Sequence, residues 1–199
     1  MTPFGFRIVQ SYRSPISESA TSEERLRTQV EDQEVELGRL RQAALRDPIT
    51  DGANMRCLGI SWDWLEDGDP VSLLTLDIDG FRQVNDSLGR TIGDALLKSV
   101  QTGLERAVRW DDVVAREGAD RFFILLPLAI AEDATVVAER IQATIEKMCF
   151  EVPQGKFKIG VRVGCATREG EEMLDSMMAR ADSACRKAKQ ESEQIVSAA

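Results

Sequence analysis

An apolar run from Val71 to Ile78 (VSLLTLDI) constrains the fold of this chain more than any other feature. It predicts a buried β-strand, because a short apolar run between polar segments is typical of a strand inside a sheet. Val113–Glu117 and Arg121–Pro127 predict two further short strands, joined by a turn that contains Gly118. Alternating apolar residues over Phe157–Thr167 predict one more strand. A sheet built from such strands needs helices to cover it.

Three segments carry the apolar periodicity of amphipathic helices: Ile92–Val108, Ala131–Met148 and Leu174–Lys189. One face of the last segment is made of small and apolar residues: Leu174, Met177, Met178, Ala181, Ala184 and Ala188. Because these segments alternate with the strands, we expect an α+β domain in which helices flank a mainly antiparallel sheet.

The N-terminal part of the chain has a different character. Residues 1–20 contain Pro3, Gly5 and Pro15 and predict a flexible arm. Thr21 followed by Glu24 predicts a capped helix start, and residues 21–46 carry a heptad seam of Leu26, Val30, Gln33, Leu37, Leu40 and Ala44. The helix should end before Pro48. The seam predicts a coiled-coil signalling helix that forms a parallel homodimer, or else a single helix that packs on its own domain.

Charge and composition exclude several classes of function. The net charge of −9 makes nucleic acid and membrane insertion unexpected, but leaves room for a small anionic ligand where basic residues cluster. The chain contains no histidine, which excludes histidine triads and histidine metal sites. The four cysteines show no CxxC spacing, so we expect free thiols. With no signal peptide and no apolar run of membrane-spanning length, we expect the protein in the cytoplasm.

Two polar turns interrupt the apolar strands. Asp77 and Asp79 lie two residues apart at the end of a strand, so their carboxylates share a face and suit Mg²⁺. The alternative is a strand end with solvated or capping aspartates. The second turn, residues 116–122 (REGADRF), is by itself an ordinary hairpin turn.

Four stretches in order along the chain resemble one bacterial family. Residues 77–94 (DIDGFRQVNDSLGRTIGD) are similar to DIDxFKxxNDxxGHxxGD, and residues 116–122 to RYGGDEF. Residues 47–54 (DPITDGAN) are similar to DxLTxLxNR, and residues 181–189 (ADSACRKAK) to ADxALYxAK. Residues 47–190 thus resemble the diguanylate cyclase (GGDEF) domain, with residues 191–199 as a tail. The resemblance implies a palm-like, nucleotidyl cyclase-like domain with a five-stranded sheet.

The resemblance implies a role for each matching residue. In this family two GTP molecules, one on each of two facing domains, are joined through a two-metal phosphoryl transfer. Asp77, the Ile78 carbonyl and Asp120 would hold the metal. Asn85 and Asp94 would bind the guanine edge, and Arg82 and Lys189 would meet the phosphates.

The family motif is altered here, and reads Gly118, Ala119, Asp120, Arg121 and Phe122. The methyl group of Ala119 obstructs a close approach of the nucleotide, and Arg121 puts a positive charge where the family has an acid. We expect Arg121 to pair with Asp77 or Asp120. Glu193 stands where the family has a phosphate-binding arginine. These changes predict a degenerate cyclase, with Mg²⁺ needed only if GTP binding survives.

A second family motif is intact. Arg109 and Asp112 match the RxxD inhibitory site, which binds cyclic-di-GMP. By the resemblance, Arg140 reaches this ligand from a neighbouring domain, and Asp133 is a further expected contact. An arginine fork suits phosphate or guanine, and a carboxylate accepts from guanine N–H groups. The sequence predicts a cyclic-di-GMP receptor with a possible protein effector. The alternatives are a weak, product-inhibited cyclase and a dimerisation scaffold that binds no nucleotide.

Overall fold

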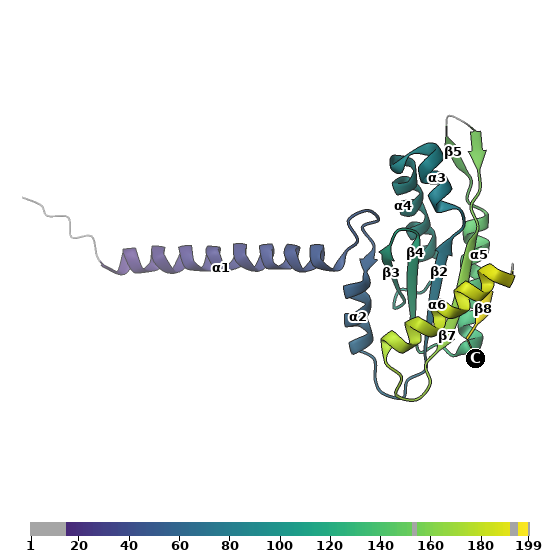
Figure 1. Ribbon diagram of the computed structural model, residues 1–199. Helices are drawn as coiled ribbons and strands as arrows, with labels where there is room; N and C mark the ends of the chain where they lie inside the picture. Colours follow the sequence, from purple (N-terminus) through teal and green to yellow (C-terminus); the bar gives the residue numbers. More distant parts are fainter. Residues whose placement is uncertain (1–14, 153–154, 192–194, 199) are drawn as a thin grey trace, which may run out of the picture. The chain divides into compact units, whose positions relative to one another are not determined.

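The computed structural model describes residues 15–152, 155–191 and 195–198, and the chain divides into two units after Ala43. Helix α1 spans Pro15–Leu45, so it begins before the capping box predicted at Thr21, and that predicted helix start is wrong (Figure 1). The reason is that the helix continues without a break through residues 16–20, so Thr21 lies inside it. Most of the predicted arm lies outside the described residues.

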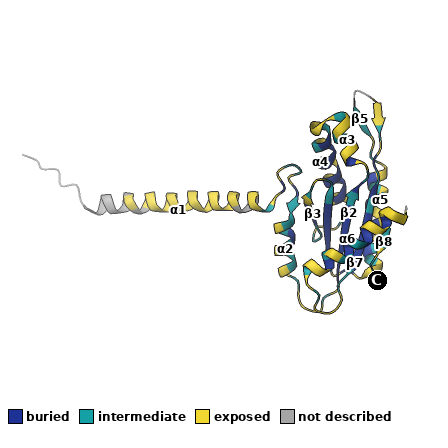
Figure 2. Ribbon diagram, in the orientation of Figure 1, coloured by how far each residue is buried: buried dark blue, intermediate teal, exposed yellow. Residues whose placement is uncertain are grey.

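The predicted heptad seam of α1 is open to solvent. Leu26, Val30, Leu37 and Leu40 are between 47% and 61% exposed. Figure 2 colours most of the described residues of this helix as exposed. Isolated helices are marginal in water, and an amphipathic helix gains most of its stability by packing its apolar face against a partner. Dimerisation through this seam stays a prediction.

The second unit is built on a six-stranded sheet in the order β1-β3-β4-β2-β7-β8. Its strands are β1 (Ala53–Asn54), β2 (Val71–Ile78), β3 (Val113–Gly118), β4 (Arg121–Pro127), β7 (Val161–Thr167) and β8 (Ile195–Ser197). The bounds predicted for β2 and β4 are confirmed. The four inner strands are antiparallel, whereas β1 and β8 each pair in parallel at an edge.

The predicted five-stranded, mainly antiparallel sheet is therefore corrected to a mixed sheet of six strands. The edge strands have two and three residues, which is too short to leave a periodic pattern in the sequence. The strand predicted from Phe157 is also divided, because β5 (Phe150–Val152) and β6 (Gly155–Phe157) form a separate two-stranded sheet. The α+β class is retained.

Helices cover both faces of the sheet, because alternate residues of the central strand point in opposite directions. Leu74 and Leu76 of β2 share a core with α4 (Arg90–Ala107) and α5 (Ala131–Glu146). Leu73 lies in a second core with residues of α2 (Met55–Asp63) and α6 (Leu174–Glu191). The buried strands between the helix layers are dark in Figure 2.

Helices α2 and α3 (Phe81–Leu88) are absent from the sequence prediction. Each has an apolar stripe, Met55, Leu58 and Trp62 in α2 and Phe81, Val84 and Leu88 in α3, but helices of nine and eight residues are too short for that stripe to repeat. Within the described part of the chain, no helix combines the length and the apolar character that a bilayer crossing requires.

Candidate functional site: two turns at the ends of strand β3

Asp77 lies at the end of β2, on the face covered by α6. In the sheet register it stands opposite Arg121 of β4 and Arg162 of β7. The Nζ of Lys189, on α6, lies 3.4 Å from an Asp77 carboxylate oxygen. Burial, and then the neighbouring Asp120 carboxylate, raise the pKa of Asp77 above its ordinary value, against the opposing charge of Lys189. The predicted pair of metal-binding carboxylates, Asp77 and Asp120, is thus brought together.

The GADRF turn joins β3 to β4 and is tied to the end of β2. The Ile78 N–H donates to the Asp120 carbonyl over 3.3 Å, which fixes the turn beside Asp77. Ala119 has a φ of +43°, in the left-handed region that glycine adopts most readily. The substitution of the second motif glycine by alanine therefore leaves the turn in a conformation that disfavours its own side chain.

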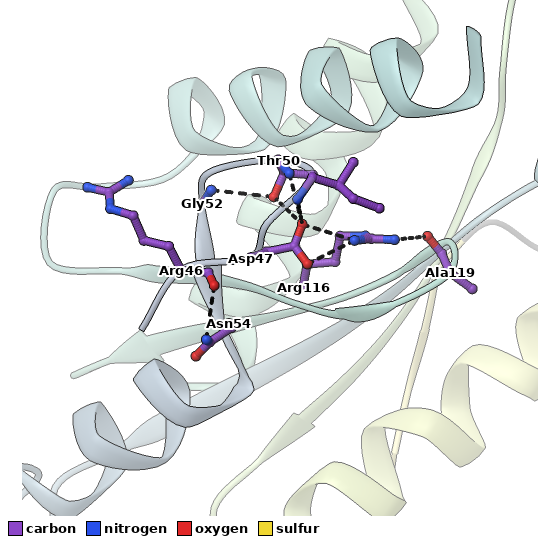
Figure 3. Close-up of polar contacts among 8 residues, drawn as sticks. Arg46, Asp47, Thr50, Gly52, Asn54, Arg116 and Ala119 are labelled. Atoms are coloured by element: carbon purple, nitrogen blue, oxygen red, sulfur yellow. Dashed lines mark hydrogen bonds and ion pairs between the residues drawn. The ribbon is translucent and has the colours of Figure 1, made fainter. Parts of the chain in front are cut away.

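A buried ion pair between Arg116 and Asp47 anchors the GADRF turn (Figure 3). The Arg116 Nη1 donates to both carboxylate oxygens of Asp47 over 2.9 Å, and its Nη2 donates to the Ala119 carbonyl over 2.8 Å. Asp47 also accepts from the backbone N–H of Thr50. Burial acts to raise the pKa of Asp47, but the Thr50 and Arg116 hydrogen bonds outweigh it and lower that pKa. The opening DPIT motif thus positions the GADRF turn.

Arg121 does not take the position predicted for it. Its guanidinium lies 3.1 Å from Asp182 of α6 and 3.4 Å from Glu117, and it pairs with these two acids instead of Asp77 or Asp120. The reason is that α6 packs over this face of the sheet and places the largely buried Asp182 carboxylate within reach of Arg121. The predicted pairing of Arg121 with a metal-ligand aspartate is therefore wrong.

The side chains at the end of β2 do not fit a two-metal centre. Asp77 is paired with Lys189, and Asp79 is paired with Arg162 over 2.9 Å. No group of three acidic or cysteine side chains arranged as metal ligands occurs among residues 15–152, 155–191 and 195–198. The carboxylates of Glu117 and Asp182, beside the same turn, are paired with Arg121.

The predicted guanine contacts lie at the junction of α3 and α4. Asn85 of α3 packs so closely on Gly93 that a β-carbon there would lie 2.0 Å from the Asn85 amide oxygen. Asp94 follows Gly93 on α4 and is half-buried. Arg82 is an exposed residue of α3 that faces Asp86 at 3.8 Å. The structure thus places Asn85 against the residue that precedes Asp94, whereas the partner of Arg82 is Asp86.

The RxxD turn connects α4 to β3 and gathers two arginines around one carboxylate. The Arg109 N–H donates to Asp112 over 2.6 Å, and the Arg140 side chain of α5 donates to the Ala107 carbonyl just before the turn. Burial, and then the Asp111 charge, raise the pKa of Asp112, while the Arg109 N–H and the charges of Arg109 and Arg140 act to lower it. Arg109, Asp112 and Arg140 of a single chain are thus close together.

Asp133 does not belong to this cluster. Its carboxylate accepts from the Ile130 N–H and caps the start of α5. It lies seven residues before Arg140 on this helix, which corresponds to about 10 Å along the axis. The predicted contact of Asp133 with the same ligand stays a prediction, and the capping bond gives this side chain a structural role.

The two turns lie at opposite ends of β3. The RxxD turn precedes Val113 and the GADRF turn begins at Gly118, so the strand separates them by about 17 Å. A hollow of about 290 Å³ lies at the RxxD end, where Arg109, Trp110 and Asp112 contribute to its wall. Glu193 lies outside the described residues.

Sequence reasoning missed the ion-pair partners that surround the GADRF turn and the end of β2. Arg162 lies within an apolar strand, and a charged residue at a half-buried strand position is a signal that it has a partner. Asp182 was visible in the closing motif, but its contact with Arg121 depends on how α6 packs on the sheet. The signal for Arg116 was the same, a charged residue at the end of an apolar run.

Comparison with known proteins identifies relatives of this chain. Diguanylate cyclase DgcP of Pseudomonas aeruginosa is 34% identical over 157 residues, which covers 75% of this chain and 23% of that protein. The chain spans 23% to 34% of the length of the curated relatives DgcP and the Escherichia coli diguanylate cyclase DgcM.

Two solved structures resemble the fold closely. The coiled coil and GGDEF domain of DgcB from Caulobacter crescentus, in complex with c-di-GMP, has a TM-score of 0.74 and 27% identity, covering 95% of this chain and all of that one. Diguanylate cyclase SiaD from P. aeruginosa, in complex with its activator SiaC, has a TM-score of 0.74 and 28% identity, covering 92% of this chain and 72% of that one. Residues 44–194 match the family described as diguanylate cyclase, GGDEF domain, and the chain belongs to this family.

Proposed function

We propose that this GGDEF domain is a receptor for cyclic-di-GMP that binds through its RxxD turn and has lost efficient cyclase activity. The observation that carries the proposal is the convergence of Arg109, Asp112 and Arg140 at one turn. A cluster of two arginines offers a local positive charge to an anionic dinucleotide, although the chain as a whole carries −9.

The chemistry of these side chains suits the ligand. The Arg109 fork can pair bidentately with a phosphate or with the O6 and N7 edge of guanine. Asp112 can accept from the guanine N–H groups when it is ionised. Arg140 is held at Ala107 by its Nε and keeps its terminal nitrogens for a phosphate. Residues of one chain would then recognise the guanine edge and also neutralise the phosphate charge.

The opposite end of β3 supports the loss of catalysis. Arg121 places a positive charge in the turn that holds Asp120, and it pairs with Asp182 and Glu117, so both of these acids already have a cationic partner. Lys189 and Arg162 already neutralise Asp77 and Asp79. A metal ion would have to displace these partners, so triphosphate and metal should bind weakly.

We further propose that α1 transmits the signal as a parallel homodimer through residues 21–46, with a protein effector as its target. The exposed apolar seam from Leu26 to Leu40 supports this. Among the relatives, DgcB combines a coiled coil with its GGDEF domain, and SiaD forms a complex with an activator protein. Ligand binding at the RxxD turn would bias the arrangement of such a dimer.

A weak, product-inhibited diguanylate cyclase is the second candidate. The closeness of Asp77 and Asp120 favours it: burial, and then the Asp120 carboxylate, raise the pKa of Asp77, and a cation could join the two carboxylates. The retained Asn85 and Asp94 favour it also. Chromatographic detection of cyclic-di-GMP formed from GTP and Mg²⁺ separates the two functions, since a receptor forms none.

Isothermal titration calorimetry with cyclic-di-GMP tests the proposal. We expect wild type to bind at micromolar or lower concentration, and Arg109→Ala to bind ~30- to 1000-fold more weakly, because one bidentate arginine contributes about 2–4 kcal/mol. Arg106→Ala is the matched control, since Arg106 is an exposed arginine in the last turn of α4. Equal losses in both variants, or no binding by wild type, would contradict the receptor function.

A further inference from the structure

Trp110 is the most exposed of the large apolar side chains that the structure describes, at 96% of its possible surface. It lies in the RxxD turn, directly after Arg109 and two residues before Asp112. Exposing a whole indole to water is unfavourable, because a tryptophan side chain carries the largest apolar surface of any residue. Covering this side chain with a flat apolar surface therefore lowers the free energy of the molecule.

The residues around Trp110 indicate which class of ligand could cover its ring. Together with Arg109 and Asp112, Trp110 lines the hollow of about 290 Å³ at the start of β3. Its neighbours in the turn are charged: Arg109, Asp111 and Asp112. The apolar side chains of Val108, Val113 and Val114 also contribute to the wall of the hollow. Charged groups that can read the edge of a planar base, beside an aromatic ring that can cover its face, fit a nucleobase.

We propose that Trp110 is a stacking platform for one guanine of the bound cyclic dinucleotide. The proposal rests on the function proposed for the RxxD turn and adds a contact to it. The guanine edge meets Arg109 and Asp112, while its face lies on the indole. The bond from the Arg109 N–H to Asp112 closes the turn across Trp110, so the backbone that carries the ring needs little ordering when the ligand arrives.

Calorimetry on Trp110→Ala, Trp110→Phe and Trp64→Ala tests the stacking contact with cyclic-di-GMP as the probe. Trp110→Ala should bind about 5- to 150-fold more weakly than wild type, the equivalent of the ~1–3 kcal/mol of one base–aromatic stack. Trp110→Phe keeps a smaller ring and should lose less. Trp64, 84% exposed at the end of α2 and outside the hollow, is the matched control and should bind as wild type does.

Intrinsic fluorescence gives an independent readout. The ligand should quench tryptophan emission in wild type and in Trp64→Phe, and this quenching should disappear in Trp110→Phe. Because the Trp110 side chain is almost wholly exposed, its variants should unfold at the wild-type temperature. A lower unfolding temperature that accounts for the lost affinity would overturn the stacking role.

The outcomes separate this inference from the receptor function. If wild type binds, Arg109→Ala loses binding and Trp110→Ala binds within about twofold of wild type, stacking is overturned and the receptor function stands. Trp110 would then be a candidate for a protein contact. If wild type fails to bind cyclic-di-GMP at all, both are overturned.

Discussion

Substitution of Arg116 by methionine should destabilise the domain more than any surface change. The substitution keeps the aliphatic part of the side chain but leaves the Asp47 carboxylate buried without its partner. The two side chains are only 5% and 11% exposed, so water cannot replace the lost bonds. Breaking a buried pair by removing one partner costs about 3–5 kcal/mol. For a chain of this size, such a loss lowers the midpoint temperature of thermal unfolding by roughly 6–20 °C.

Urea unfolding followed by circular dichroism measures this loss, and a neighbouring ion pair provides the control. Arg46 and Asp51 also pair, but their side chains are 53% and 86% exposed, so Arg46→Met should cost at most about 1 kcal/mol. The double variant Asp47→Asn with Arg116→Met buries no charge and should be more stable than Arg116→Met alone. Equal, small losses for Arg116→Met and Arg46→Met would refute the reasoning.

The ion pair between Asp47 and Arg116 also predicts how the stability of the domain changes at acid pH. The pKa of Asp47 in the folded domain lies below its ordinary value of 3.8, so the folded state favours the ionised form. Stability from this group is present in full above that ordinary value, and is lost as the pH falls through the lower folded pKa. Asp47→Asn should remove this part of the acid dependence in thermal melts below about pH 4.

Three further predictions concern the two turns and the sheet. Burial raises the pKa of Asp112, so the affinity for cyclic-di-GMP should begin to fall at a higher pH than an ordinary carboxylate would predict. A titration of affinity from pH 7 downwards measures this. Asp112→Asn should weaken binding and flatten the pH profile. Arg121→Glu should let millimolar Mg²⁺ raise the unfolding temperature by calorimetry, whereas an equal rise in wild type would contradict the inhibitory role of Arg121. Gly164→Ala should lower stability by at least about 2–3 kcal/mol in urea unfolding, because its β-carbon would lie 2.1 Å from the backbone oxygen of Ala181.

Sequence patterns predicted the parts of the fold that are long and apolar. The strands Val71–Ile78 and Arg121–Pro127 have the predicted bounds, because uninterrupted apolar runs bury both faces of a strand. Helix α6 begins at the predicted Leu174 for the related reason that its small residues form a continuous stripe. The edge strands Ala53–Asn54 and Ile195–Ser197 were missed, since two or three residues carry no period.

The candidate site was predictable as a set of residues, but its contacts were not. The motifs predicted that Asp77 and Asp120 meet at one site, and that Arg109 and Asp112 lie in one turn. The choice of partner for Arg121 depended on the packing of α6, which places Asp182 closer than the aspartates next to it in the sheet. The Arg140 bond to Ala107 likewise depends on how α5 lies beside α4. Such contacts between distant segments follow from tertiary packing and leave no local pattern.

The central claim is that the RxxD turn binds the cyclic dinucleotide while the GADRF turn no longer binds GTP productively. Calorimetry of wild type in one buffer, with cyclic-di-GMP and separately with GTP and Mg²⁺, tests this most directly. The account predicts micromolar or tighter binding of cyclic-di-GMP and no measurable heat with GTP. Tight binding of GTP with Mg²⁺, accompanied by formation of cyclic-di-GMP in the same sample, would contradict it.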